Sequence, residues 1–133
     1  MGLVFLSQAQ IKHKIGEKFG GGIVYDVSAD GLHGLVAETI DQGQGNWVQA
    51  KDIAKNGKHS DAGKAFTDWY LPSKIELNKL FLQRNTVGGF SEDFYWSSSQ
   101  EHNFYNTYYQ LFYIGKHLPI MPAVTFVRAV RAF

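Results

Sequence analysis

Residues 68–81, DWYLPSKIELNKLF, carry the clearest structural signal in this sequence. Pro72 disfavours a helical conformation at the residue before it, so a helix can begin only after this point. Ser73 and Glu76 have the spacing of a capping box, in which each side chain accepts the backbone N–H of the other residue. The stretch therefore predicts a helix over residues 73–84. Its expected buried face consists of Ile75, Leu77, Leu80 and Phe81.

The chain on either side of this helix predicts strands and one more helix. Residues 20–37 surround an Ala-Asp-Gly turn and predict a β-hairpin. Residues 46–56 predict a short helix that Asn46 can cap, and the polar residues 58–68 predict an exposed loop. Three later stretches predict strands, namely FYWSSS (94–99), NTYYQLFYI (106–114) and AVTFVRAVRAF (123–133). The last has two partly apolar faces, so we expect one C-terminal strand inside the sheet.

Composition limits both the architecture and the function. With 133 residues, 44% of them hydrophobic and 19% charged, the chain is long and apolar enough for one packed domain. We expect an α+β class, a single compact domain with a largely antiparallel sheet and two main helices. The net charge of +1 is far from that of a dedicated nucleic-acid binder. The absence of cysteine excludes disulfides and thiol chemistry.

No catalytic or metal-binding motif stands out. The sequence contains no HExxH, GxSxG, Walker or GxGxxG pattern, and none of its five histidines lies three or four residues from another. Ser97, Ser98 and Ser99 fit small polar residues at a strand edge better than a nucleophile. We therefore expect no enzyme activity, no metal and no cofactor. The first residues form neither a signal peptide nor a membrane span, so an export signal is expected outside this chain.

Basic residues are the best candidates for binding. Lys51, Lys55, Lys58, His59 and Lys64 lie close together in the sequence, and Lys51 and Lys55 share a helical face. Such a run is ordinarily a solvated surface, and the alternative is a site for sulfate or phosphate groups, which ammonium groups bind at varied spacing. Two smaller basic groups are secondary candidates, comprising Lys12 and Lys14, and Lys116 and His117.

Two arginines near the end of the chain have an open role. Arg128 and Arg131 are three apart in the last predicted strand, so they point to opposite faces. At least one of them must be at least partly buried, and a buried guanidinium needs a carboxylate or carbonyl partner. The sequence leaves open whether these arginines are structural or bind a ligand.

Five stretches, in this order, resemble the Lcl C-terminal domain family, which is named for the Legionella collagen-like adhesin. They are KFGGGIVYDV (18–27), DGLHGLVAE (30–38), DWYLPSKIELNKL (68–80), VGGFSEDFYWSSS (87–99) and VRAVRAF (127–133). The combination of WxLPSxxEL, YWSS and a terminal VRAVR is the specific part. The resemblance covers residues 14–133 and leaves 1–13 as an N-terminal segment, either a stalk junction or an expression remnant.

The resemblance implies a fold related to C-type lectins and formylglycine-generating enzymes. It also implies a homotrimeric, extracellular adhesin head that follows a collagen-like stalk and binds sulfated glycosaminoglycans or other anionic polysaccharides. The lysine-rich loops would carry this binding. The apolar stretches GLVFL (2–6) and HLPIMPAV (117–124) agree with a trimer, since they are poorly explained as exposed segments.

Two departures from better-known lectin-like relatives matter. Trp96 is followed by Ser97 and Ser98 in place of a calcium-binding motif, and the chain has no cysteine for formylglycine-generating chemistry. Binding is therefore expected to be calcium-independent and non-catalytic, without membrane insertion. The alternative is a structural tip or tail-fibre domain that binds a protein partner, and a hydrolase is a more distant third possibility.

Overall fold

The computed structural model describes residues 10–100, 107–112, 115–120 and 124–133, with only the backbone described at 107–109, 111 and 117–120. The elements in chain order are β1 (Lys18–Phe19), β2 (Gly22–Val27), β3 (Gly34–Ala37), β4 (Gly43–Gly45), α1 (Trp47–Asn56), the 3-10 turn η1 (Gly63–Ala65), α2 (Lys74–Leu82), α3 (Arg84–Val87), β5 (Phe94–Gln100), β6 (Thr107–Leu111), β7 (His117–Ile120), β8 (Thr125–Val127) and β9 (Val130–Ala132). The chain is thus a small single domain that mixes helices with mainly antiparallel sheet.

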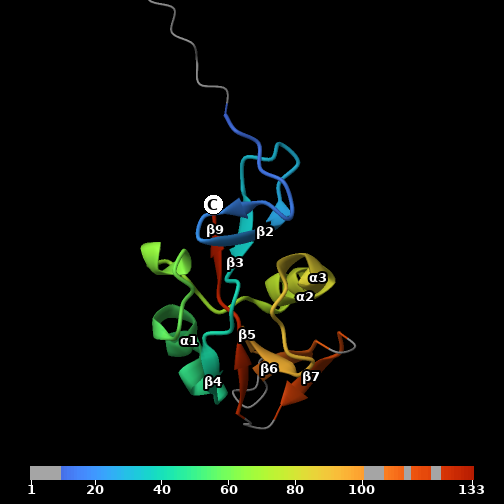
Figure 1. The fold of residues 1–133 in the computed structure, drawn as a ribbon. Helices are drawn as coiled ribbons and strands as arrows, with labels where there is room; N and C mark the ends of the chain where they lie inside the picture. Colours follow the sequence, from blue (N-terminus) through green and yellow to red (C-terminus); the bar gives the residue numbers. More distant parts are fainter. Residues whose placement is uncertain (1–9, 101–106, 113–114, 121–123) are drawn as a thin grey trace, which may run out of the picture.

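The strands form two sheets where the sequence predicted one. One sheet has the order β1-β2-β3-β9, and the other has the order β4-β8-β5-β6-β7. Every pairing is antiparallel except that between β5 and β8. In Figure 1 the four-stranded sheet lies above the five-stranded sheet, with α1 on the left and α2 and α3 on the right.

The prediction of one C-terminal strand is wrong. Residues 123–133 contain β8, which lies between β4 and β5, and β9, which lies at the end of the other sheet beside β3. Between them, the backbone at Ala129 bonds outside both ladders, because its N–H donates to the side chain of Gln42 and its carbonyl accepts from Glu38. The C-terminal segment therefore joins the two sheets instead of crossing the middle of one.

Both predicted helices begin where the sequence placed them. Ser73 Oγ accepts the N–H of Glu76, and Glu76 Oε1 accepts the N–H of Ser73 over 2.9 Å, so the capping box is confirmed. Asn46 forms a second capping box with Gln49 at the start of α1. The helical region after Ser73 is divided, because α2 ends at Leu82 and α3 follows before Gly88.

The predicted buried face of α2 needs one correction. Leu77 and Leu80 are fully buried and Phe81 is partly buried, whereas Ile75 is 71% exposed. Two residues along a helix rotate the side chain by about 200°, so Ile75 and Leu77 cannot both face the same core. The sequence prediction placed both on one face because it considered only that they are apolar and not where each lies around the helix axis.

The segment Trp69-Tyr70-Leu71 separates two hydrophobic clusters. Trp69 and Leu71 belong to a cluster with Trp96 against α1, while Tyr70 packs against the other cluster, which includes Leu77 of α2. Such alternation is typical of extended backbone. The backbone of Tyr70 also pairs with Val130 of β9, so this short segment ties α2 to the upper sheet.

Two smaller predictions also change. Residues 58–68 are not uniformly exposed, since they contain η1, and Gly63 is buried and accepts a hydrogen bond from the Trp69 indole N–H. Ser97 is fully buried on β5, which lies inside its sheet rather than at an edge. None of the helices in the described part of the chain is long and apolar enough to cross a membrane.

Candidate functional site

Four exposed lysines lie on and after α1, and we call them the lysine surface. They are Lys51, Lys55, Lys58 and Lys64. The helix positions the first two, because Ala50 and Ala54 are fully buried against the core and the next residue in each case points outward. Lys58 comes directly after Gly57, which caps the C-terminus of α1, and Lys64 lies in η1.

The lysine surface borders a shallow hollow of about 300 Å³. Its lining residues are Lys51, Lys55, Trp69, Tyr70, Leu71 and Ser98. The segment 69–71 thus has two roles, since its side chains separate the core clusters and also line this hollow. The arrangement combines two ammonium groups with a mainly apolar wall, and small-molecule sites are typically apolar with a few placed polar groups.

Most of the positive charge on this surface lacks a carboxylate partner. The Asp52 carboxylate accepts a hydrogen bond from Asn56, and Asp61 pairs weakly with Lys64 at 3.4 Å in full solvent exposure. Lys51 Nζ lies 5.3 Å from the centroid of the Trp47 ring. Among the described residues, Lys51, Lys55 and Lys58 form no ion pair. These ammonium groups are available to an external anion.

His59 is fixed within the protein. Its Nδ1 lies 2.8 Å from Glu38 Oε2, and its Nε2 lies 3.0 Å from the Lys55 carbonyl oxygen. The ring also stacks on Trp69 at a centroid distance of 5.5 Å. Both ring nitrogens therefore have partners, and His59 positions the loop after α1 rather than offering a free nitrogen to a ligand.

The Glu38 carboxylate is the centre of this contact. It is fully buried and accepts hydrogen bonds from Thr39, His59 and Ser60. Burial disfavours the charged form, but the hydrogen bonds from Ser60, Thr39 and His59 outweigh it and hold the pKa of Glu38 below its ordinary value. A buried carboxylate thus anchors the segment that carries Lys58.

The other predicted binding residues lie elsewhere. Lys12 and Lys14 are exposed beside the β2–β3 turn, where the His13 N–H donates to the Gly31 carbonyl, at the opposite end of the molecule from α1 (Figure 1). Lys116 is exposed just before β7, at the sheet edge opposite β4, on which α1 packs. The side chain of His117 lies outside the described part of the structure. The nine predicted residues therefore do not form one patch.

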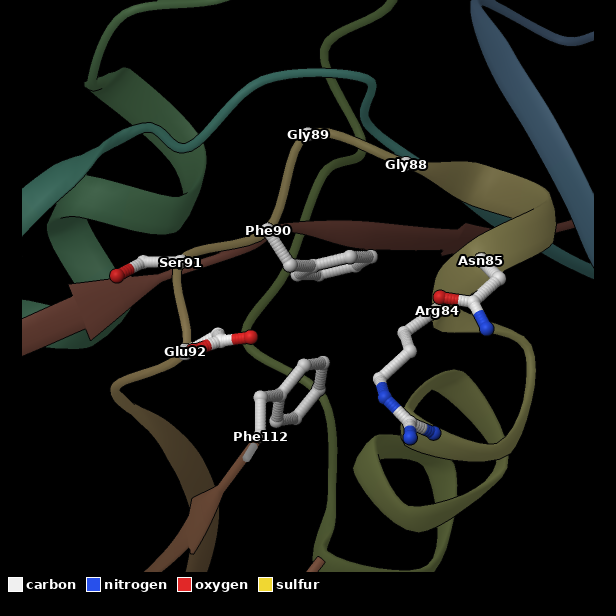
Figure 2. A pocket seen from close by; sticks show the side chains of 8 residues that line it. All are labelled: Arg84, Asn85, Gly88, Gly89, Phe90, Ser91, Glu92 and Phe112. Atoms are coloured by element: carbon white, nitrogen blue, oxygen red, sulfur yellow. The ribbon is translucent and has the colours of Figure 1, made fainter. Parts of the chain in front are cut away.

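A cleft of about 390 Å³ lies on the α3 side of the molecule, and the sequence did not indicate it. It is lined by Arg84, Asn85, Gly88, Gly89, Phe90, Ser91, Glu92 and Phe112 (Figure 2). The Gly88-Gly89 pair was a weak signal of a special loop conformation. Nothing in the sequence pattern indicated that Phe112 would complete the wall.

Within the described ranges, no group of three or more His, Asp or Glu side chains could hold a metal ion. No model of a known protein family matches this chain, and a search of curated proteins gave no match.

Proposed function

We propose that this chain is the head domain of a trimeric extracellular adhesin that binds sulfated glycosaminoglycans or similar anionic polysaccharides. In this proposal the domain is related to the Lcl C-terminal domain family and, through it, to C-type-lectin-like folds. Binding requires neither calcium nor a cofactor, and the ligand is not cleaved. The resemblance of residues 14–133 to that family motivates the class of protein.

The observation that carries the proposal is the lysine surface beside the hollow, because Lys51, Lys55 and Lys58 form no ion pair among the described residues. A sulfated sugar presents an anionic group together with a ring whose C–H face is apolar. Lys51 and Lys55 supply the ammonium groups that line the hollow, and Tyr70 and Leu71 supply its apolar wall.

Three copies make this modest surface effective. A single exposed ion pair contributes roughly 0–1 kcal/mol, so one lysine surface alone binds weakly. When three surfaces contact one polymer chain, the later contacts are intramolecular and the modest affinities combine. A domain with a net charge of +1 can in this way retain a polyanion. Binding should weaken steeply with salt because condensed counterions are released.

Immobilised heparin tests the proposal with two matched variants. The first carries Lys51→Ala, Lys55→Ala and Lys58→Ala, and the second carries Lys12→Ala, Lys14→Ala and Lys116→Ala. Both lose three positive charges, all from exposed side chains. We expect the first variant to elute at clearly lower salt than the parent and the second to elute near the parent. Equal shifts in both variants would show that total charge, not the lysine surface, governs retention.

One observation favours the alternative of a structural tip domain. Ile75 and Leu82 are 71% and 66% exposed on α2, and seven residues place them on the same side of the helix. Such a pair suits a contact between proteins, either between copies of this chain or with a partner. A parent protein that passes through the heparin column without retention would favour this alternative over polysaccharide binding.

A further inference from the structure

One wall of the cleft beside α3 is held by contacts with Arg128. The carbonyls of Gly88 and Gly89 accept hydrogen bonds from the Arg128 guanidinium at 3.1 and 2.7 Å. Both glycines have positive φ, at 79° and 75°, so their carbonyls can turn inward together. The Phe90 ring then lies over the same guanidinium at 3.9 Å.

A second contact fixes the other end of this loop. The Tyr95 hydroxyl accepts the N–H of Ser91 at 2.8 Å and donates to Asp41 Oδ2 at 3.0 Å. Asp41 also accepts a hydrogen bond from Arg128 Nε at 2.9 Å. Burial, together with the charge of Asp41, raises the pKa of Tyr95, which keeps this hydroxyl protonated as a donor. One hydrogen-bond network, formed by Asp41, Tyr95 and Arg128, therefore holds the loop at residues 88–91 in place.

The side chains that face the cleft keep free hydrogen-bonding capacity. Arg84 donates one hydrogen bond to the Phe81 carbonyl at 3.0 Å and lies over the Phe81 ring. Its other N–H groups have no hydrogen-bond partner among the residues that the structure describes. Glu92 is exposed, and among the described residues its carboxylate pairs with no cation. Figure 2 shows Arg84 and Glu92 on opposite sides of Phe112, with Asn85 beside Arg84.

From this geometry we propose that the cleft is a second binding site, which takes one uncharged sugar ring. A sugar hydroxyl both donates and accepts hydrogen bonds, so neighbouring hydroxyls match the donors of Arg84, the acceptors of Glu92 and the amide of Asn85. The C–H face of the ring packs on the partly buried Phe90. Phe112, which is buried at 2% exposure, supports Phe90 from the core at a ring-centroid distance of 4.8 Å. The volume of about 390 Å³ lies in the range of small-ligand sites.

This site is independent of the lysine surface. It contains one cation and one anion, so it has no excess positive charge to attract sulfate, and α1 does not contribute to it. The wall formed by residues 88–91 is fixed before a ligand arrives, which lowers part of the ordering cost of binding. Sugar binding here should therefore be insensitive to salt, in contrast to heparin binding.

An NMR titration of the isotope-labelled chain tests this site. The probes are the methyl glycosides of glucose, galactose and mannose, and N-acetylglucosamine. We expect at least one of them to cause saturable shifts of the amides at 84–92, with a Kd on the order of millimolar, and none at 51–58. The double variant Asn85→Ala with Glu92→Gln changes exposed side chains and should weaken this binding about tenfold or more.

The matched control is the double variant Lys55→Ala with Lys58→Ala, which should bind the sugar like the parent while eluting from heparin at lower salt. Three results would overturn the assignment. They are a lack of saturable shifts with all four sugars, unchanged affinity in the Asn85 and Glu92 variant, or shifts caused by glycine, a zwitterion, in place of the sugars. None of these results bears on the lysine surface, so the two sites are tested separately.

Discussion

Arg128 Nε donates a hydrogen bond to Asp41 Oδ1 over 2.9 Å, and the arginine side chain is completely buried. The same guanidinium bonds the carbonyls of Glu38, Gly88 and Gly89. Arg128 therefore joins the C-terminal segment to the loop that lines the cleft. Burial raises the pKa of Asp41, although the Arg128 charge and the hydrogen bonds from Tyr95 and Arg128 act in the opposite direction. The expected carboxylate and carbonyl partners of Arg128 are confirmed.

Arg128→Met should strongly destabilise the fold. The substitution leaves Asp41 with only the Tyr95 hydroxyl as a donor and removes the donor to the carbonyls of Glu38, Gly88 and Gly89. Breaking a buried pair in this way costs about 3–5 kcal/mol. Urea unfolding measures the change in the free energy of unfolding. Lys79→Ala is the control, because its 3.1 Å contact with Asp26 is largely exposed and should contribute less than about 1 kcal/mol. Similar small losses in both variants would contradict a structural role for Arg128.

Glu38 should make stability depend on acid pH. Its pKa is lower in the folded chain than its ordinary value of 4.5, so folding favours the ionised form. The stabilisation it contributes is present above that value and is lost as pH falls through the folded pKa. The free energy of unfolding should therefore drop more steeply between about pH 6 and pH 3 in the parent than in Glu38→Gln. Asp68, whose pKa is also lowered, is present in both proteins and does not account for the difference.

Two alanine variants test which face of α2 is buried. Leu77 is fully buried, so Leu77→Ala should cost about 2–5 kcal/mol of unfolding free energy. Ile75 is 71% exposed, so Ile75→Ala should change stability by no more than about 0.5 kcal/mol. Both variants remove similar apolar volume from one helix. A large loss for Ile75→Ala would mean that this residue is covered, for example by another copy of the chain.

The two glycines of the cleft loop should respond differently to alanine. Both have positive φ, and Gly88 combines it with a ψ of 174°, so each substitution costs about 1–3 kcal/mol in backbone strain. A Cβ at Gly89 would also lie 2.8 Å from the Thr39 carbonyl oxygen, while one at Gly88 would meet nothing within 4 Å. Gly89→Ala should therefore lower the midpoint of thermal unfolding more than Gly88→Ala. Equal midpoints would show that the Gly89 backbone does not pack against Thr39.

The proposed trimer can be checked by light scattering. At micromolar concentration we expect a mass of about three times the 15.0 kDa of one chain. The family resemblance and the apolar stretches at residues 2–6 and 117–124 motivated the trimer. Residues 2–6 and 121–123 and the side chains of 117–120 lie outside the described part of the structure, and Val124 is 68% exposed. A monomer at every concentration would mean that the head domain does not trimerise on its own.

The sequence determined the features that depend on neighbouring residues. The capping boxes at Ser73 and Asn46 join residues three apart, and the Ala29-Asp30-Gly31 turn fixes the hairpin between β2 and β3. Lys51 and Lys55 share an exposed face for the same reason, because helical geometry alone places residues four apart together. These local rules predicted both helix starts and the first part of the lysine surface.

Only the tertiary structure decided which distant groups meet. His59 contacts Glu38, which precedes it by 21 residues, and Arg128 contacts Asp41, which precedes it by 87. Because of its pairing, His59 has no ring nitrogen left for a ligand. Arg128 lies between β8 and β9, where the C-terminal stretch passes from one sheet to the other. Alternation along a strand shows that two faces are covered but not which elements cover them. That choice follows from packing the whole chain, because each buried polar group must find its partner wherever the fold brings one.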